Sequence, residues 1–135
     1  MDRFALVNWL AVIVAAASGF VIGSLWYGPV FGKVWMRLTG MTKEKGAQAN
    51  MAVTFGGAYV LNLIAALGIA TVSVDHAGVM FALHVGLLGA FFFVAPALGV
   101  IYLFEQQPFR LWLVNAGYQA VNFTTMGAII GAWPG

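Results

Sequence analysis

Four long apolar stretches run along the chain, separated by short polar or proline-containing segments. Each stretch is long enough to cross a hydrocarbon core of about 30 Å at a helical rise of roughly 1.5 Å per residue. Their apolar residues are continuous rather than alternating, which favours transmembrane helices over the strands of a closed barrel. We therefore predict an all-α membrane protein, a single four-helix bundle over residues 1–135, with spans at about 7–27, 51–74, 77–104 and 109–133.

The segments between these stretches contain residues that end helices. Gly28 and Pro29 follow the first stretch, and we expect the first helix to end there because proline lacks an amide donor and clashes with the preceding turn. Asp75 marks a tight turn between the second and third helices, and Pro108 closes the break before the fourth. Pro96 is not flanked by polar residues, so it predicts a kink inside the third helix rather than a break.

The composition agrees with a membrane environment. Hydrophobic residues make up 62% of the chain and charged residues 7%, with a mean hydropathy of +0.93, whereas soluble domains carry roughly 25% charged residues. So few charges cannot cover a soluble surface, and the lipid bilayer is the predicted solvent and partner. The chain has no cysteine, which excludes disulfides and thiolate chemistry. Basic residues are not interleaved with aromatics beyond one short loop, so nucleic acid is not an expected partner.

The positions of the basic residues predict the orientation of the chain in the membrane. Lysine and arginine accumulate in cytoplasmic loops. The loop between the first two helices and the loop between the last two contain five basic residues, and the opposite side has only Arg3. We expect both loops in the cytoplasm and both termini on the non-cytoplasmic side. The five residues are Lys33, Arg37, Lys43, Lys45 and Arg110.

The first loop has a helical pattern of its own. Aromatic and aliphatic side chains fall at helical spacing on one face of residues 31–38, with Lys33 and Arg37 off that face. This predicts a short amphipathic helix in the cytoplasmic interface, with its rings at headgroup level and its basic groups towards anionic lipid. The helix either anchors the first span or forms a specific lipid or partner site. The predicted interfacial anchor residues are Trp26, Tyr27, Lys33, Trp35 and Arg37.

Polar residues on the fourth helix are the clearest candidates for a functional site. They recur at i, i+3, i+4 and i+7 on one helical face, and they are Asn115, Tyr118, Gln119 and Asn122. Such a face is costly to expose to lipid, so we expect it to face protein or a wet cavity. Asn62, near the middle of the second helix, is an expected partner. The stripe is either hydrogen-bonded glue between helices or the lining of a small polar pathway.

His84 is the ionisable residue that lies well inside a predicted span. We expect a neutral imidazole hydrogen-bonded to a neighbouring helix, and the alternative is a proton relay or ligand contact. Paired carboxylates are absent from the spans, and two histidines cannot form a closed metal site without further ligands. We therefore expect no enzymatic activity, no cofactor and no metal.

Glycine spacing predicts close contacts between helices. Gly19 and Gly23 form one GxxxG pattern, and Gly127 and Gly131 form another. Small residues at this spacing let helix backbones approach each other in the membrane. Because such a small bundle has little interior of its own, we also expect a homo-oligomer.

Both ends of the chain carry motifs of a known family. The N-terminal motifs are Leu25-Trp26-Tyr27-Gly28-Pro29 and Phe31-Gly32-Lys33, and the C-terminal motifs are Asn115-Ala116-Gly117-Tyr118-Gln119 and Met126-Gly127-Ala128-Ile129. These runs resemble the domain of unknown function 1761 family, a group of small, mostly bacterial membrane proteins. The resemblance implies a single four-helix membrane domain and brings no established activity with it.

Two functions are consistent with these patterns. The leading prediction is a non-enzymatic protein of the bacterial inner membrane whose four-helix bundle self-associates. The alternative is a small transporter or channel with a neutral polar pathway. The sequence does not identify a small-molecule ligand. The residues that would line the pathway are Asn62, His84, Asn115, Gln119 and Asn122.

Overall fold

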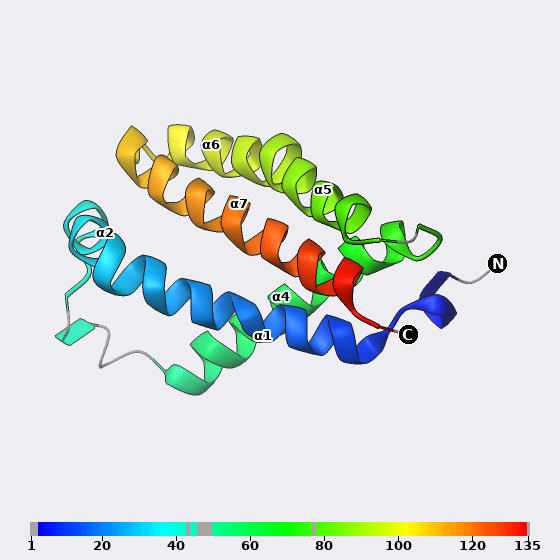
Figure 1. Cartoon of the computed structure of the whole chain (residues 1–135). Helices are drawn as coiled ribbons and strands as arrows, with labels where there is room; N and C mark the ends of the chain where they lie inside the picture. The colour runs from blue at the N-terminus through cyan, green and yellow to red at the C-terminus, as the bar shows by residue number, and fades with distance from the viewer. Residues whose placement is uncertain (1–2, 43, 46–49, 77, 135) are drawn as a thin grey trace.

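The computed structural model describes residues 3–42, 44–45, 50–76 and 78–134, and every regular element in these ranges is a helix (Figure 1). The all-helical prediction is therefore confirmed. Within the longer helices, η2 and η3 are single π-helical turns. In chain order the elements are η1 (Arg3–Leu6), α1 (Trp9–Leu25), η2 (Trp26–Val30), α2 (Gly32–Thr39), α4 (Met51–Ser73), α5 (Val79–Gly89), η3 (Ala90–Val94), α6 (Ala95–Phe104) and α7 (Phe109–Ala132).

The long helices run back and forth between two ends of the molecule. The two chain ends and the turn between α4 and α5 lie at one end, which we call the terminal end (Figure 1). The opposite end contains α2 and the turn between α6 and α7. We call it the basic end, because α2 contains Lys33 and Arg37 and the first turn of α7 contains Arg110. Lys43 and Ala77, the first residue of the predicted third span, lie outside the described residues.

Three helical segments are long and apolar enough to cross a membrane, namely Trp9–Val30, Met51–Ser73 and Val79–Phe104. They correspond to the first three predicted spans, so the chain has the apolar helices of a membrane-embedded protein. With 24 residues, α7 is equally long. Its polar stripe makes it less apolar than the other three, and it is not among the segments that qualify.

Gly28 and Pro29 do not end the first helix, contrary to the prediction. The chain passes them in the π-helical turn η2, where the amide of Phe31 donates to the carbonyl of Trp26, five residues earlier, at 2.8 Å. A π turn is wider than an α turn, so the helix continues although Pro29 has no amide to donate. The first span consequently runs to Val30.

The helix predicted in the first loop is present as α2. It begins at Gly32, where a Cβ atom would lie 2.5 Å from the carbonyl oxygen of Tyr27, so only glycine fits the sharp change of direction after η2. It ends at Gly40, whose φ of +74° forms a left-handed helix cap. Along α2, Lys33 and Arg37 are exposed.

The third helix is continuous, but it is distorted next to Pro96. After α5, the chain passes through the π-helical turn η3 and continues as α6. Pro96 lies in the first turn of α6. Because proline has no amide hydrogen, the carbonyl one turn earlier receives no α-helical hydrogen bond from it. A wide turn beside the proline thus replaces the simple kink that we expected.

Near the terminal end, α5 and α7 approach so closely that only glycine fits between them. A Cβ atom on Gly86 would collide with the backbone of α7, and one on Gly127 would collide with the carbonyl oxygen of Ala82. At Gly131 a Cβ atom would lie 2.8 Å from the Cα atom of Val79. The contact therefore contains the predicted pair Gly127 and Gly131, and Gly86 of the facing helix completes it.

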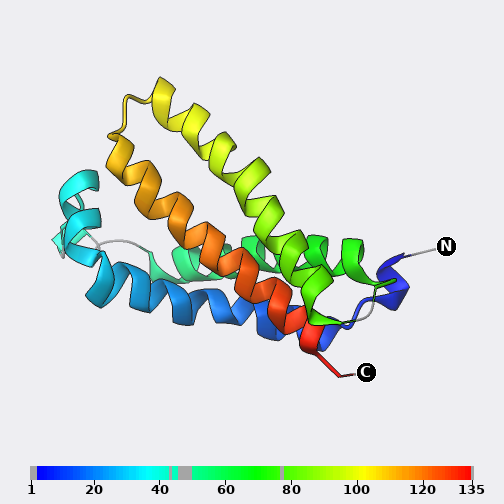
Figure 2. The same ribbon diagram turned by 45° about the horizontal axis from the view of Figure 1, so that its top comes forward.

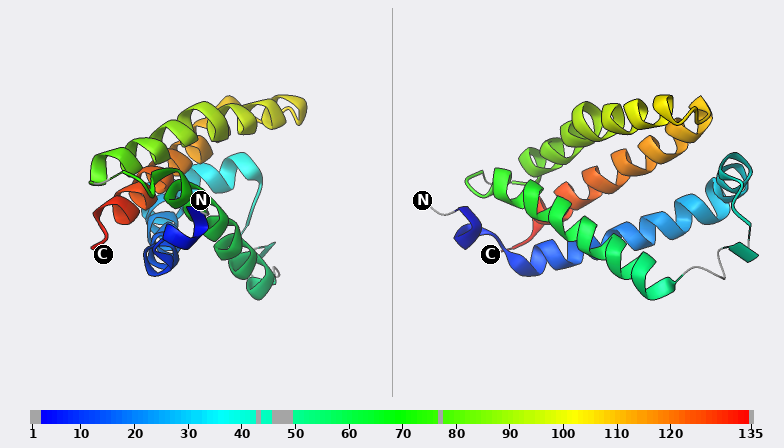
Figure 3. Two further views of the ribbon diagram at one scale, coloured as in Figure 1. Left: turned by 90° about the vertical axis from the view of Figure 1, so that its right-hand side faces the viewer. Right: turned by 180° about the vertical axis from the view of Figure 1, so that it is seen from behind.

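The apolar core occupies the half of the bundle nearest the terminal end. At the other end the helices separate: α6 diverges from α7 (Figure 2), and α4 crosses α1 so that its first turns swing away from the other helices (Figure 3, left). Residues 51–58 of α4 are all exposed. The buried core residues are Val7, Val12, Ala15, Ala66, Ile69, Ala70, Ala82 and Met126.

The close approach of α5 and α7 generates the first prediction. Gly86→Ala places a methyl group against backbone that cannot move aside, so we expect the free energy of unfolding to fall by about 1–3 kcal/mol. Gly68→Ala is the matched control, because a Cβ atom on Gly68 meets nothing within 4 Å. Titration of both variants with denaturing detergent measures the difference, and equal stabilities would contradict the close contact.

Candidate functional site

An amide bridge joins three helices where α1, α4 and α7 cross. Asn122 of α7 is completely buried, and its Nδ2 donates to Oδ1 of Asn62 in α4 at 3.2 Å. Asn62 in turn donates through Nδ2 to the backbone carbonyl of Ala16 in α1 at 3.2 Å. A longer contact of 3.4 Å joins Asn122 Nδ2 to Oε1 of Gln119. We call Asn62 and Asn122 the asparagine bridge.

The partners determine the orientation of both amides in the asparagine bridge. The carbonyl of Ala16 can only accept, so Asn62 turns its NH₂ group towards α1 and its Oδ1 towards Asn122. Asn122 therefore donates, and its own Oδ1 is the buried side-chain atom in the described ranges that has no hydrogen-bond partner. That oxygen faces Gly19, where a Cβ atom would lie 3.0 Å away and would collide with the amide of Asn62. Gly19 thus provides the space for the bridge.

A second cluster of hydrogen bonds lies closer to the basic end. The hydroxyl of Tyr27 donates to Asn115 Oδ1 at 2.6 Å, and Asn115 Nδ2 donates to the hydroxyl of Tyr102 at 2.8 Å. One turn further along α7, the hydroxyl of Tyr118 donates to the carbonyl of Gly19 at 2.9 Å. The rings of Tyr27 and Tyr118 lie 5.3 Å apart. We call Tyr27, Tyr102, Asn115 and Tyr118 the tyrosine–asparagine cluster.

The aromatic and the basic residues predicted as interfacial anchors differ in what surrounds them: the aromatic residues contact other parts of the protein, and the basic ones are exposed. Trp26 donates its indole N–H to the carbonyl of Val114 in α7 at 2.9 Å, so its polar atom bonds another helix rather than a headgroup. Tyr27 does the same through the tyrosine–asparagine cluster. Trp35 of α2 is half-buried with its ring 5.6 Å from that of Tyr27, whereas Lys33 is exposed. The aromatic anchors therefore connect helices, because each ring reaches a backbone or side-chain acceptor on α7 or packs on a ring that does.

His84 does not join either group of polar residues. Its Nδ1 lies 2.7 Å from the carbonyl of Met80, four residues earlier in its own helix, and the side chain is exposed. The predicted hydrogen bond to a neighbouring helix is therefore wrong. The carbonyl one turn back lies within reach of the ring, so Nδ1 finds its partner in its own helix.

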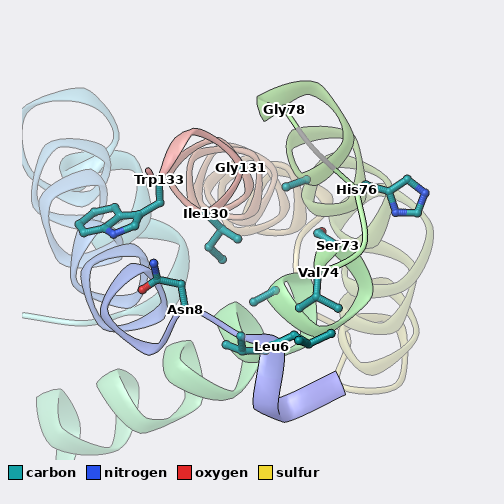
Figure 4. Close-up of a pocket in the computed structure, with 12 residues that line it drawn as sticks. Leu6, Asn8, Ser73, Val74, His76, Gly78, Ile130, Gly131 and Trp133 are labelled. Carbon is teal, nitrogen blue, oxygen red and sulfur yellow. The ribbon is translucent and has the colours of Figure 1, made fainter. Parts of the chain in front are cut away.

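Two concave regions lie beside these residues. A cavity of about 350 Å³ at the terminal end lies among the segment before α1, the turn after α4, and the end of α7, with His76 at its edge and Trp133 on the opposite side (Figure 4). Several of its polar atoms are already paired: the Oδ1 of Asn8 accepts from an amide of α1, Ser73 donates to its own helix, and Nδ1 of His76 lies 3.1 Å from Asp75.

The other concave region is a groove of about 690 Å³ between α1, α4 and α7, which we call the α1–α4 groove. Tyr118 and Gly23 form part of its wall, and a Cβ atom on Gly23 would lie 3.6 Å from the ring of Tyr118. Towards the basic end the groove reaches Tyr27, Asn115 and Trp35. The groove thus connects the tyrosine–asparagine cluster with the uncovered first half of α4.

Across the ranges that the structure describes, no three histidine, cysteine, aspartate or glutamate residues gather closely enough to hold an ion. His76 and Asp75 pair with each other, and the ring of His76 stacks on Phe81 at 3.6 Å.

The family of the chain is established by its sequence over most of its length. A family model described as protein of unknown function (DUF1761) matches residues 10–131. The chain belongs to the DUF1761 family. The resemblance drawn from the motifs at both ends is thereby confirmed, and in this DUF1761 protein both hydrogen-bonded groups lie inside the matched region. No curated protein and no solved structure matches the chain.

Several contacts of this DUF1761 protein have no clear signal in the sequence. Tyr102, near the end of the third helix, and Trp112, near the start of the fourth, have the positions of membrane-interface aromatics. In the structure Tyr102 accepts from Asn115, and Trp112 donates to the carbonyl of Ala95 at 2.8 Å. Tyr59 similarly donates to the carbonyl of Ile13 at 3.0 Å. Trp112 and Tyr59 join helices through backbone acceptors and Tyr102 does so through a side-chain amide, and sequence patterns do not distinguish these partners.

The asparagine bridge generates the second prediction. In a cycle of Asn62→Leu, Asn122→Leu and the double variant, we expect a coupling free energy of about 0.6–1.7 kcal/mol, because each single change removes the same hydrogen bond. Asn62→Leu combined with Thr124→Val is the control, since the Thr124 hydroxyl donates to its own helix. Reversible unfolding in detergent measures the couplings, and a value near zero for the asparagine pair would show that the bridge does not form.

Proposed function

We propose that this protein is a non-enzymatic, four-span protein of the bacterial inner membrane whose polar interior is structural and whose bundle self-associates. The proposal rests on one observation, the hydrogen bonds that the polar stripe of α7 makes to other helices. Asn115 bonds Tyr27 of η2 and Tyr102 of α6, Tyr118 donates to α1, and the Nδ2 of Asn122 donates to α4. A polar face whose groups bond to neighbouring helices stabilises the packing of those helices, and it leaves few free polar groups to line a path for solutes.

The enclosure of α7 supports a fourth span. This helix packs against α1, α4 and α5, and it is covered more than the other long helices (Figure 1). Polar residues that face protein are tolerated inside a membrane, so the lower apolarity of α7 agrees with a central crossing helix. The basic residues of α2 and α7 then favour the basic end in the cytoplasm and both termini outside. The exposed Lys33 and Arg37 agree with α2 lying in the cytoplasmic interface.

Self-association is supported by an uncovered face of α4. Val53, Gly56 and Val60 lie at i, i+3 and i+7 and are exposed, and a Cβ atom on Gly56 or Gly57 meets nothing within 4 Å. We call these four residues the free α4 face. Small residues on a membrane helix allow a second backbone to approach closely. A second copy of the chain packed there would cover the part of α4 that its own bundle leaves open.

A small transporter or channel is the second candidate, and one observation favours it. The buried Oδ1 of Asn122 has no hydrogen-bond partner in the middle of the bundle, as a solute-binding oxygen would require. The Asn122→Leu variant distinguishes the two functions in proteoliposomes. A transporter would lose solute flux and stay folded, whereas a structural bridge would lose stability with no flux to lose.

The four-span arrangement generates the third prediction, which uses the absence of native cysteine. Gln107→Cys lies in the turn before α7, and Pro134→Cys lies after it. If α7 crosses the membrane, a membrane-impermeant maleimide should label Pro134→Cys in spheroplasts and Gln107→Cys only in inverted vesicles. Labelling of both from the same side would show that α7 does not cross, and the reversed pattern would overturn the orientation.

Self-association generates the fourth prediction. Oxidation of native membranes should convert Gly56→Cys into a disulfide-linked dimer, because the proposed contact brings two copies of the free α4 face together. Ile101→Cys is the matched control, since Ile101 is equally an exposed residue of a predicted span but lies on α6. Denaturing gels without reductant measure the dimer. Equal crosslinking of both variants would reveal random collision and contradict the proposed interface.

A further inference from the structure

The long helix formed by α5, η3 and α6 faces α7 with a row of small residues. From Ala82 to Ala90 these residues are four apart, and the same spacing returns in α6, so they share one face of the helix. Across η3 the spacing is five, and the amide of Ala95 donates to the carbonyl of Ala90 over this wider turn. The extra residue therefore keeps the row on the side of α7. The row consists of Ala82, Gly86, Ala90, Ala95 and Gly99.

Small residues of α7 lie opposite this row. Gly127 packs against the backbone of α5, and two turns closer to the basic end Ala120 and Ala116 line the space beside η3 and α6. The close contact at the terminal end sets the antiparallel register, which places Ala95 near the level of Ala116. We call the row of the third long helix, together with Ala116, Ala120 and Gly127, the small-residue seam.

The small-residue seam is closed along α5 and open along α6. Ala82, Gly86 and Ala90 are buried, whereas Ala95 and Gly99 are only half-buried and α6 contains no buried residue. Figure 2 shows α6 diverging from α7 over this part. Cavities of about 580 Å³ and 250 Å³ lie between the two helices. The residues that permit a close contact thus continue into a region where the helices stand apart.

The side chain of Trp112 separates the open part of the seam. It lines both cavities, so it lies between them. Its Nε1 donates to the carbonyl of Ala95 at 2.8 Å, and a Cβ atom on Gly99 would lie 3.2 Å from the same nitrogen. The indole therefore rests on the small residues of α6 and holds this helix away from α7.

Interruptions of the α-helical pattern flank α6 at both ends. At η3 the amide of Ala95 bonds five residues back rather than four, and Pro96 has no amide to donate. At the other end, residues 105–108 form an exposed turn in which Gln106 has a left-handed φ of +57°. Such interruptions allow a helix to change direction relative to its neighbours. The ten residues of α6 are thus a rigid segment between two joints.

Few interactions oppose a movement of α6. Two side-chain hydrogen bonds join it to α7 in the described ranges, from Trp112 to Ala95 and from Asn115 to Tyr102. Lipid tails are as apolar as the side chains of α6, so the hydrophobic effect does not fix its position in a membrane. By contrast, the π-helical turn η2 is held by Trp26 and Tyr27, which both donate to groups of α7.

We propose that α6 is a movable strap that closes onto α7 when the Trp112 side chain leaves the space between them. The structure shows the open position. In the closed position Ala95 packs against Ala116 and extends the close contact of α5 with α7. Tyr102 moves with α6, so its hydrogen bond with Asn115 links the strap to the tyrosine–asparagine cluster. The strap adds a conformational change to the packing role proposed for the bundle, and it depends on neither the oligomer nor the orientation.

The fifth prediction measures the strap with pairs of spin labels, which the absence of native cysteine permits. Leu25→Cys on α1 is combined with Ile101→Cys on α6 or, as the reference, with Leu87→Cys on α5. All three residues are exposed. Because α7 lies between α1 and α6 (Figure 1), closure shortens the distance of the α6 pair. By pulsed electron–electron resonance of full-length protein in lipid vesicles, the α6 pair should give two distances and the α5 pair one.

Two substitutions should shift the α6 pair in opposite directions. Trp112→Ala removes the side chain that separates the helices. It should raise the ratio of the shorter to the longer distance by about threefold or more, the factor that one hydrogen bond between membrane helices implies. Ala116→Phe fills the closed contact from the cavity side and should leave the longer distance alone. Neither substitution should change the α5 pair.

The outcomes that contradict the strap are distinct. A single distance for the α6 pair that Trp112→Ala does not change would show that α6 is fixed. Equal shifts of the α5 and α6 pairs would show a general loosening of the bundle and would also overturn the strap. If Trp112→Ala does not fold, Trp112→Phe keeps a ring without the N–H donor and should shift the α6 pair in the same direction. A fixed α6 would leave the maleimide labelling of α7, and with it the four-span bundle, intact.

Discussion

The hydrogen bond between Asn62 and Asn122 is the interaction around which the other contacts are arranged. An amide buried among apolar helices must be paired, since neither water nor lipid can satisfy it at low cost. Pairing Asn122 with Asn62 requires α4 to cross α1 closely at one level, and this in turn requires Gly19 to have no side chain. The glycine at position 19 and the close crossing of α4 over α1 are therefore both consistent with this pairing.

This crossing explains why the two halves of the bundle differ. Towards the terminal end, glycines bring α5 and α7 into backbone contact, and the apolar core fills the space beside them. Towards the basic end the helices separate, and hydroxyl and indole groups of Tyr27, Tyr102 and Trp26 bridge the wider gaps. Long aromatic side chains can span a distance that small residues cannot, so polar contacts replace backbone contacts there.

The separation leaves two different surfaces on one helix. One side of α4 forms the α1–α4 groove with Thr54 and Ala58, and the opposite side is the free α4 face with Gly56 and Val60. In the self-associating bundle that we propose, the amide bridge sets the crossing, and the crossing exposes the part of α4 where a second copy would pack.

Local patterns determined the apolar spans, the helix in the first loop and the polar face of α7, because hydropathy and helical spacing are properties of neighbouring residues. They could not predict that Pro29 lies inside a continuous helix, since a π turn and a helix end differ only in the path of the following chain. Nor could they show that His84 bonds its own helix, or that Trp26 reaches the backbone of Val114, which is 88 residues away. Such partners depend on the rotation and crossing of whole helices. Those are decided by the packing of glycines and amides in three dimensions, which the order of residues does not reveal.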